Sequence, residues 1–373
     1  MLEIKEKIGK LGFGLMRLPM NGEEVDIEQT KQMVDLFLEN GFTYFDTAYG
    51  YINGKSEEAA KTAIVDRYPR DKFQLATKLP AWAGPKTEKE AKDMFWTSLK
   101  RTGVDYFDFY LLHNLGGKRT KFFDDFGIWD FVLEQKAQGR IKHIGFSMHA
   151  KADYLDELLT KHPEMEFVQL QINYADWDSA TVEAGKCYEV ARKHGKPVVI
   201  MEPVKGGALA NLPEPVAKVF DAANANASYS SWAIRYAASL EGVLTVLSGM
   251  STLDQVKDNV SYMRDFKPLT NEEKAVVVNA QAELAKIPTI PCTDCQYCVE
   301  GCPQNIPIPG VFSAMNSYKI FADIKRSKGS YTFATRNSGK ASECVECGAC
   351  EGVCPQSIEI IKELKDCASV LEG

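Results

Sequence analysis

Cysteine is nearly absent from the first 290 residues of this 373-residue chain. Of the ten cysteines, only Cys187 lies in that part, and the other nine follow residue 290. A secreted disulfide framework would need a signal peptide, whereas clustered cysteines in CxxC spacing indicate metal binding. We therefore expect one large domain that does not depend on cysteine, followed by a small one that does.

Long apolar runs and an excess of basic residues are also missing. The N-terminal segment MLEIKEKIGKLGFG has no apolar stretch typical of a secretion signal, and no run of about 18 apolar residues occurs. Lys and Arg number 44 against 51 Asp and Glu, a formal net charge of −7. Binding to nucleic-acid phosphates requires clustered basic side chains. We expect a cytoplasmic protein with no nucleic-acid partner and no membrane partner.

Short apolar runs alternate with amphipathic segments up to residue 287. Segments with a 3.6-residue period at 27–40, 88–102, 182–194 and 253–263 predict helices. Strands separated by helices pair in parallel, and buried parallel strands are almost continuously apolar. An open doubly wound sheet fits this alternation, but eight units in about 250 residues favour an α/β fold of the (β/α)8 TIM-barrel type. The predicted strands are residues 11–15, 43–48, 73–79, 107–113, 141–147, 167–173, 197–203 and 244–250.

Helix ends carry several local signals. Gly41 follows the first predicted helix as a C′ glycine, and Thr87 with Glu90 forms a capping-box pattern before the helix at 88–102. A last helix at 271–287 ends at IPTIPC, where two prolines mark a boundary. The expected domains are a barrel at residues 1–287 and a cysteine-rich domain at residues 288–373.

Polar residues stand at the ends of the predicted strands. Active sites of such barrels lie at the carboxyl ends of the strands. Burying Asp46 or Lys78 there without a partner would cost several kcal/mol, so we expect the two side chains to pair. The polar residues at these ends are Asp46, Lys78, His113, Ser147, Asn173 and Ser248, and Tyr51 follows Asp46 by five positions.

Seven segments around these strand ends resemble the motifs of the aldo/keto reductase superfamily, in the family's order. The resemblance covers residues 10 to about 265 and implies a catalytic tetrad of Asp46, Tyr51, Lys78 and His113. The segments are FDTAYGYINGKSEEAAKTAI, LATKL, YLLHNL, GFSMH, QLQINY, MEPVKGGAL and LSGMSTLDQVKDN.

The tetrad suits carbonyl reduction. A carbonyl that accepts a hydride develops charge on oxygen, so a proton donor must lie beside it. Tyrosine, with a pKa of about 10, is a weak acid near neutrality. We expect Lys78 to lower the pKa of Tyr51, Asp46 to keep Lys78 charged, and His113 to donate a hydrogen bond to the same oxygen.

Each member of the tetrad has an alternative interpretation. Asp46 would cap the following loop, Lys78 would form a structural ion pair, and His113 would be a satisfied strand-end histidine. Tyr49 competes with Tyr51 for the role of acid. The histidines at positions 143, 149, 162 and 194 are expected to be structural.

The resemblance also implies a nicotinamide cofactor. Strongly NADPH-specific members carry Lys or Arg where this chain has Met250 and Gln255, and the only nearby cation, Lys257, has a helical phase that points elsewhere. NADPH and NADH therefore both stay open, as does the alternative that these residues are core polar groups. Implied for the nicotinamide end are Ser147, Asn173, Gln169 or Gln171, and Tyr174, and for the adenosine end Ser248, Gly249, Ser251, Gln255 and Asn259.

The cysteine-rich domain repeats the pattern C-x2-C-x2-C-x3-C-P, beginning at Cys292 and at Cys344. This is the bacterial ferredoxin run for two [4Fe–4S] clusters, in which the fourth cysteine ligates the other cluster. Zinc, the alternative, favours paired CxxC knuckles without a third and fourth cysteine in this register. The expected ligand sets are Cys292, Cys295, Cys298 and Cys354 for one cluster, and Cys344, Cys347, Cys350 and Cys302 for the other.

The interval between the motifs is expected to contain a helix from Val311. This part resembles the small, mostly α-helical ferredoxin-like iron–sulfur domains attached to larger oxidoreductases. Residues 316–340 hold six Lys or Arg and one Asp, a local charge of +5. Such a segment suits an acidic electron carrier of ferredoxin or flavodoxin type, or is a solvated face. Cys187 and Cys367 are expected to be inert core residues.

Three functions fit these features. The first is reduction of a small carbonyl substrate by NADPH or NADH, with redox-active clusters. Nicotinamide transfers two electrons as hydride and a cluster takes one, so coupling them needs a flavin, for which the chain shows no fingerprint. The second is a ferredoxin- or flavin-linked electron-transfer reductase whose barrel holds substrate or flavin. The third is a nicotinamide-sensing subunit without turnover.

Overall fold

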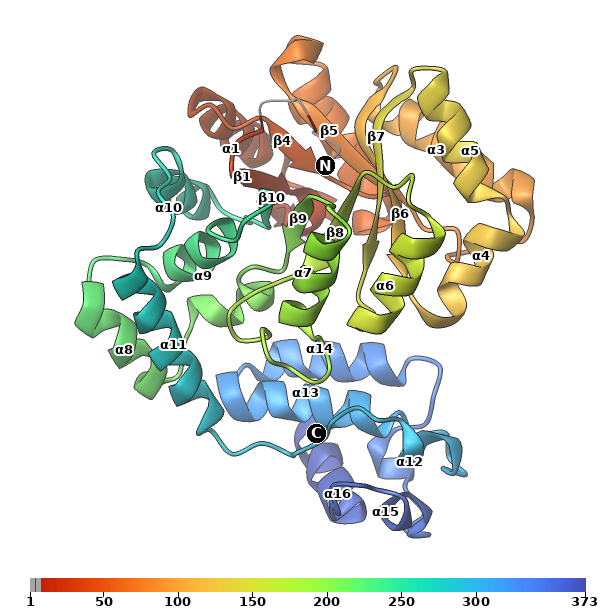
Figure 1. Ribbon diagram of the computed structural model, residues 1–373, viewed down its shortest axis with the longest axis vertical. Coiled ribbons are helices and arrows are strands. Elements are labelled where there is room, and N and C mark those ends of the chain that lie inside the picture. The colour runs from red at the N-terminus through yellow and green to blue at the C-terminus, as the bar shows by residue number, and fades with distance from the viewer. Residues whose placement is uncertain (1–3, 5–7) are drawn as a thin grey trace. The chain divides into compact units, whose positions relative to one another are not determined.

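Eight parallel strands close into a barrel, in the order β1-β10-β9-β8-β7-β6-β5-β4 (Figure 1). The computed structural model describes residue 4 and residues 8–373. Each predicted apolar run coincides with one barrel strand to within two residues at either end, which confirms the barrel. The strands are β1 (Leu11–Gly14), β4 (Tyr44–Asp46), β5 (Gln74–Leu79), β6 (Phe107–Leu115), β7 (Ile141–Met148), β8 (Phe167–Gln171), β9 (Val198–Met201) and β10 (Val243–Ser248), and a hairpin of β2 (Met20–Asn21) and β3 (Glu24–Val25) follows β1.

The four helices predicted between these strands begin and end within two residues of their predicted bounds. Gly41 has a left-handed φ of 83°, and its N–H donates to the Leu38 carbonyl. Only half of the predicted capping box forms, because Thr87 caps the Glu90 N–H while the Glu90 carboxylate accepts from the Lys86 N–H instead of that of Thr87. The helices are α1 (Ile27–Glu39), α2 (Lys55–Ala60), α3 (Glu88–Thr102), α4 (Thr120–Asp125), α5 (Ile128–Ala137), α6 (Ala152–Lys161), α7 (Ala184–Lys193), α9 (Tyr229–Ala238) and α10 (Leu253–Met263).

The barrel interior has an apolar layer that is followed by polar residues. Alternate residues of a strand point to the same face, so residues two apart share the interior. Tyr44, Phe109 and Phe167 pack with neighbouring ring centroids 5.1 and 5.3 Å apart. A Cβ at Gly145 would lie 2.5 Å from the Phe167 carbonyl oxygen, so glycine on β7 leaves room for this strand. Two residues beyond Tyr44 stands Asp46, and the interior therefore becomes polar toward the strand ends.

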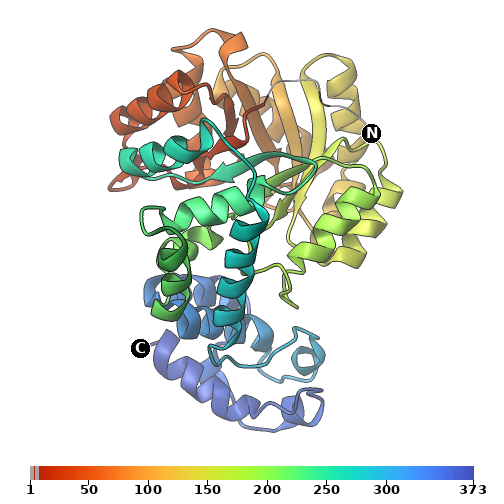
Figure 2. The ribbon, with the colours of Figure 1, turned by 60° about the vertical axis from the view of Figure 1, so that its left-hand side comes forward.

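The chain divides into two compact units, of which the second comprises Ala210–Ala225 and Ala275–Gly373. The domain boundary predicted at residue 287 stays a prediction. Figure 2 shows the C-terminal part of this unit in blue, where α13 packs against α14 and α16. Within the part of the chain that the structure describes, no helix has the length and apolar character needed to cross a bilayer. The unit contains α8 (Glu214–Asn224), most of α11 (Asn271–Ala285), α12 (Tyr297–Glu300), α13 (Ile308–Phe321), α14 (Ile324–Thr335), α15 (Ala349–Gly352) and α16 (Ile360–Leu371).

Candidate functional site

A buried ion pair joins the ends of β4 and β5. The ammonium of Lys78 donates to Asp46 Oδ1, and both side chains are almost fully buried. The ammonium also donates to the Thr47 carbonyl at 2.7 Å. Burial opposes charge on Lys78, but Asp46 and Tyr51 outweigh it and hold the pKa of Lys78 above its ordinary value. The expected pairing of Asp46 with Lys78 is therefore present, with the lysine as an ammonium.

Tyr51 lies against this ammonium and beside His113. The Lys78 Nζ atom is 4.8 Å from the Tyr51 ring centroid, and the His113 ring centroid is 5.7 Å from it in an edge-on arrangement. Tyr49, the competing residue, instead places its ring under the Arg101 guanidinium, 4.5 Å from the centroid. The structure thus brings together Asp46, Tyr51, Lys78 and His113. The Tyr49 N–H donates to the Lys78 carbonyl at 3.1 Å, but the Tyr49 ring lies against Arg101 and not against the Lys78 ammonium.

The net effect on the Tyr51 hydroxyl differs from the sequence-based expectation. Burial raises the pKa of Tyr51 above its ordinary value, although Lys78 opposes this through its charge and a hydrogen bond. The expectation of a lowered pKa was wrong in sign, because sequence reasoning counted the neighbouring cation and left out the desolvation of a phenolate inside the barrel. Tyr51 is therefore a protonated phenol throughout the neutral pH range.

His113 is a neutral imidazole. Burial, with the Lys78 charge as a smaller contribution, lowers the pKa of His113 well below its ordinary value. Its carbonyl accepts a hydrogen bond of 2.8 Å from the Trp82 indole, which fixes the end of β6. A neutral imidazole keeps one N–H donor, so it can donate to a carbonyl oxygen without adding a second positive charge beside Lys78.

Three buried polar atoms near the ends of β6 and β8 have no hydrogen-bond partner among the described residues. They are His113 Nδ1, Asn114 Oδ1 and Gln169 Oε1. Buried polar atoms in native proteins are almost always paired, so such a group points to a ligand or ordered water. Asn114 was not among the predicted site residues. A left-handed φ of 57° at this asparagine is the one local signal that the structure adds.

The residues predicted for the nicotinamide end divide into two sets. Ser147 Oγ accepts the Asn114 N–H at 2.9 Å, and the buried ring of Tyr174 packs edge-on against Tyr236 with centroids 6.1 Å apart. Gln171 and Asn173 both donate to the carboxylate of Asp176, at 3.0 and 2.8 Å.

Asp176 is a residue that sequence reasoning missed. It is buried and forms an ion pair with Lys205, from the loop after β9. His149, expected to be structural, lies 3.1 Å from Gln171 Oε1 through its Nδ1 atom and so belongs to the same network. The network fixes the amides of Gln171 and Asn173, whereas Gln169 lies deeper and contributes a hydrogen bond to Asp46.

The residues predicted for the adenosine end lie together after β10. Asn259 donates to Ser248 Oγ at 2.6 Å, and Gln255 Oε1 accepts the Ser251 N–H at 2.7 Å. Lys257 pairs with Asp254 at 3.1 Å.

Lys257 is not the only cation in this region, which corrects the sequence-based view. The Arg17 side chain passes Gly249, where a Cβ would lie 3.3 Å from Arg17 Cδ, and its guanidinium is half-exposed. The nearest carboxylate is that of Glu202, at 3.4 Å. No local pattern points to this contact, because Arg17 is 232 positions from Gly249 along the chain.

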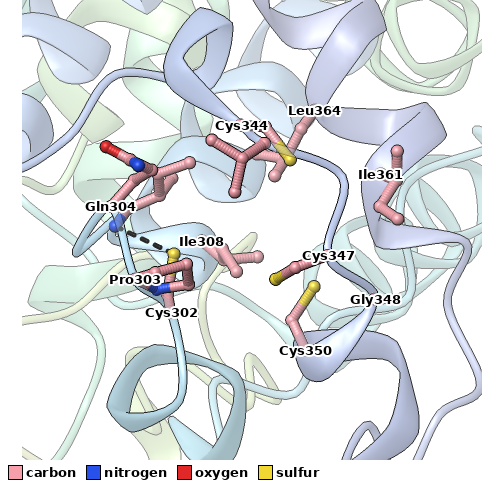
Figure 3. Close-up of a pocket in the computed structure, with 12 residues that line it drawn as sticks. Cys302, Pro303, Gln304, Ile308, Cys344, Cys347, Gly348, Cys350, Ile361 and Leu364 are labelled. Atoms are coloured by element: carbon pink, nitrogen blue, oxygen red, sulfur yellow. Dashed lines mark hydrogen bonds between the residues drawn. The ribbon is translucent and has the colours of Figure 1, made fainter.

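The eight cysteines of the two motifs line two cavities of about 320 Å³ each. One is lined by Cys302, Cys344, Cys347 and Cys350, together with Ile308 and Leu364 (Figure 3). The other is lined by Cys292, Cys295, Cys298 and Cys354. These are the two groupings that the ferredoxin pattern predicts, with one cysteine exchanged between the motifs; as ligand sets they stay predictions.

The two cysteine motifs have the same backbone conformation, 52 positions apart. Left-handed φ values occur at Asp294 and Glu346, at Gln296 and Gly348, and at Asn305 and Ser357. The third cysteine of each motif is 7% exposed. The two cysteine loops therefore match each other in both sequence and backbone conformation.

The chemistry of these cavities suits iron–sulfur clusters. Four thiolates around an apolar cavity are the donor set of a [4Fe–4S] cluster, and hydrogen bonds to the sulfurs tune it. The Ile306 N–H donates to Cys302 Sγ at 3.4 Å. Burial raises the pKa of the Cys298 thiol to about 11, so a bound metal must supply the charge that stabilises the thiolate. Among the described residues, no group of three or more His, Cys, Asp or Glu side chains is arranged to hold a single metal ion.

A polar site at the carboxyl ends of the strands defines the chain as a barrel of enzyme type. Residues 10–281 match the model of the Aldo/keto reductase family, and residues 291–359 match that of the 4Fe-4S dicluster domain. The chain belongs to the aldo/keto reductase family, an oxidoreductase family, and carries a C-terminal 4Fe–4S dicluster domain.

Relatives with known sequences or structures agree with this assignment. An aldo-keto reductase of Mycolicibacterium smegmatis is 31% identical over 140 residues, 38% of this chain and 46% of that protein. The chain spans less than half the length of the first curated relatives it matches.

Two solved structures share the barrel. The aldo-keto reductase AKR11C1 from Bacillus halodurans, in its holo form, has a TM-score of 0.59 at 26% identity and covers 73% of this chain and 92% of its own. An aldo-keto reductase from Klebsiella pneumoniae in complex with NADPH has a TM-score of 0.56 at 21% identity, covering 72% and 90%. At 21% identity, the likeness to the Klebsiella pneumoniae structure shows a shared fold.

Replacing Asp46 by Asn tests the ion pair. We expect Asp46→Asn to lower the free energy of unfolding by about 3–5 kcal/mol near neutral pH, because it leaves a buried charge without its partner. The pKa of Lys78, raised in the native pair, would then fall below its unfolded value, so the loss should shrink as pH rises. Urea unfolding at about pH 7 and about pH 10 measures both effects. The matched variant Asp46→Asn/Lys78→Met should recover most of the stability; no recovery would contradict the pairing.

Pairwise cysteine replacements test the exchanged ligands. We expect Cys354→Ser to reduce iron from about eight to about four atoms per chain, because it removes one ligand of one cluster. Adding Cys295→Ser should cause no further loss, whereas adding Cys347→Ser should remove both clusters. Cys367→Ser, a buried cysteine outside both cavities, is the control. If Cys295→Ser and Cys347→Ser exchanged these outcomes, each motif would hold its own cluster.

Proposed function

We propose that the barrel reduces a small carbonyl compound with a nicotinamide cofactor, and that Tyr51 donates the proton. The observation that carries this proposal is the position of Tyr51, whose ring lies 4.8 Å from the Lys78 ammonium and 5.7 Å from the His113 ring. A protonated phenol, a buried ammonium and a neutral imidazole N–H together suit an oxygen on which negative charge develops.

The residues divide the work of one reaction. A bound nicotinamide supplies the hydride for the carbonyl carbon. Tyr51 gives its hydroxyl proton to the carbonyl oxygen, and Lys78 stabilises the tyrosinate that is left. Asp46 keeps the ammonium charged and fixed, and His113 orients the carbonyl oxygen through its N–H. The net change is carbonyl, hydride and proton to alcohol, and solvent returns the proton to Tyr51.

The residues present fit a dinucleotide. The unpaired atoms His113 Nδ1, Asn114 Oδ1 and Gln169 Oε1 are buried polar groups of the kind that a ligand satisfies. Arg17, half-exposed beside Gly249, adds a cation that suits a cofactor phosphate. The Klebsiella pneumoniae neighbour was crystallised in complex with NADPH, which supports the same class of cofactor here.

The pH dependence of carbonyl reduction tests the role of Tyr51. The pKa of Tyr51 is raised above 10, so we expect kcat/KM for reduction to stay flat through neutral pH and to fall only above about pH 10. Tyr51→Phe should lower kcat at least about 100-fold and remove that fall. The control is Tyr49→Phe, which keeps the ring under Arg101 and should retain activity. Full activity of Tyr51→Phe would show that Tyr51 is not the proton donor.

A second function, electron transfer through the clusters, is supported by the two cysteine-lined cavities. We propose that the clusters are redox-active and exchange electrons with the barrel or with a carrier. The two four-cysteine cavities both contact Ile308, and clusters bound there would form a pair of neighbouring one-electron redox centres. A flavin would be required to couple hydride to one-electron transfer.

EPR spectra of anaerobic protein, before and after addition of NADPH or NADH, separate the two routes. We expect the nicotinamide to reduce the clusters, which would show one redox circuit and require a bound flavin, visible in the absorption spectrum. If the clusters stay oxidised while an aldehyde is reduced, the barrel works alone. Reduced ferredoxin or flavodoxin is then the next donor to add, and the exposed basic face of α14, with Lys325, Phe333 and Arg336, is the docking surface we propose for it.

A further inference from the structure

The segment that carries Tyr51 has an unusual backbone. Ile52, Asn53 and Gly54 follow it with φ values of 50°, 55° and 92°, three consecutive left-handed residues. Glycine adopts this conformation freely, but a β-branched isoleucine does so only under strain. Such a conformation persists only where surrounding contacts impose it. The contacts that hold this segment therefore also decide where the Tyr51 hydroxyl lies.

One arginine of α3 contacts the segment on both sides of Tyr51. Arg101 Nη1 donates to the Tyr49 carbonyl at 3.0 Å, and the guanidinium lies over the Tyr49 ring. On the other side, a Cβ at Gly54 would lie only 2.9 Å from Arg101 Cζ. The guanidinium therefore occupies the space beside Gly54, and the absence of a side chain there lets the turn close on it.

Arg101 is itself fixed by a buried carboxylate. Its Nη1 atom is 3.4 Å from Glu57 Oε2, and the Glu57 side chain is fully buried. The other oxygen, Glu57 Oε1, accepts from Thr77 Oγ1 at 2.7 Å. Thr77 directly precedes Lys78 on β5, so the contacts run from the strand of the ammonium, through Glu57 and Arg101, to the loop of the tyrosine.

We propose that Arg101 is a positioning residue, which holds the left-handed turn after Tyr51 and so sets the Tyr51 hydroxyl against Lys78. Its contacts are with Tyr49, Gly54 and Glu57, and it acts on Tyr51 through them. This inference rests on the proposed role of Tyr51 as proton donor. It assigns a function to a helix residue that lies 50 positions from Tyr51 along the chain.

Arg101→Gln tests the proposal. A small misplacement of a catalytic group costs up to about 100-fold in rate, so we expect kcat to fall about 10- to 100-fold. KM for the aldehyde should stay within about twofold, because no binding contact is removed. In a Tyr51→Phe background, the same change should cause no further loss of the residual activity, since the group it positions is gone. An equal loss in both backgrounds would overturn the proposal and leave Arg101 a stabilising residue.

Two milder variants keep the test informative if Arg101→Gln does not fold. Arg101→Lys keeps a cation for Glu57 but lacks the planar fork, so stability should stay near that of the parent while kcat stays low. Gly54→Ala should lower kcat in the same way. Its matched control is Gly50→Ala, where φ is −96° and a Cβ meets nothing within 4 Å, and this variant should keep full activity.

The outcomes separate the two claims. Full activity of Tyr51→Phe defeats the proposed function whatever Arg101 does. If Tyr51→Phe is inactive while folded Arg101→Gln and Arg101→Lys keep kcat within about twofold of the parent, only the positioning role fails.

Discussion

The cost of a charged lysine inside the barrel is the constraint on which the site depends. An ammonium buried as deeply as Lys78 stays charged only if a carboxylate and further hydrogen bonds replace water, and Asp46 and the Thr47 carbonyl supply these. The partners come from neighbouring strands, β4 and β5, so barrel closure creates the pair. The aromatic layer of Tyr44, Phe109 and Phe167 excludes water below it. The phenol of Tyr51 and the neutral imidazole of His113 then lie beside the ion pair without adding charge to the site.

Much of this arrangement could be predicted from the sequence, because it depends on short-range patterns such as apolar runs and cysteine spacing. The eight apolar runs gave the strands to within two residues, and the end of each run gave the position of the site. Asp46 and Lys78 stood out as charges that close apolar runs. The cysteine groups followed from the ferredoxin pattern, in which the first three thiols of a motif surround one cluster and the fourth ligates the other.

Contacts between distant loops were not readable. Arg17 meets Gly249, and Asp176 meets Lys205, through loops whose approach depends on the closed barrel. The pKa of Tyr51 was expected with the wrong sign because sequence shows a nearby cation but not the loss of water around the phenol. Tyr49 and Tyr51 are two positions apart, yet their rings lie against different cations, Arg101 and Lys78.

Because the fourth cysteine is exchanged between the two cavities, truncation of the chain affects both cavities at once. In the proposed ligand sets, each cavity needs both ends of the interval from Cys302 to Cys344. A chain that ends within that interval lacks five cysteines, four of them from the second motif, and neither cavity then has a full set. Cys302 would be stranded without its three partners, and the first three cysteines would lack Cys354. The iron content of this unit therefore reports whether the chain is intact. A chain that ends in this interval would keep neither cluster with all four cysteine ligands.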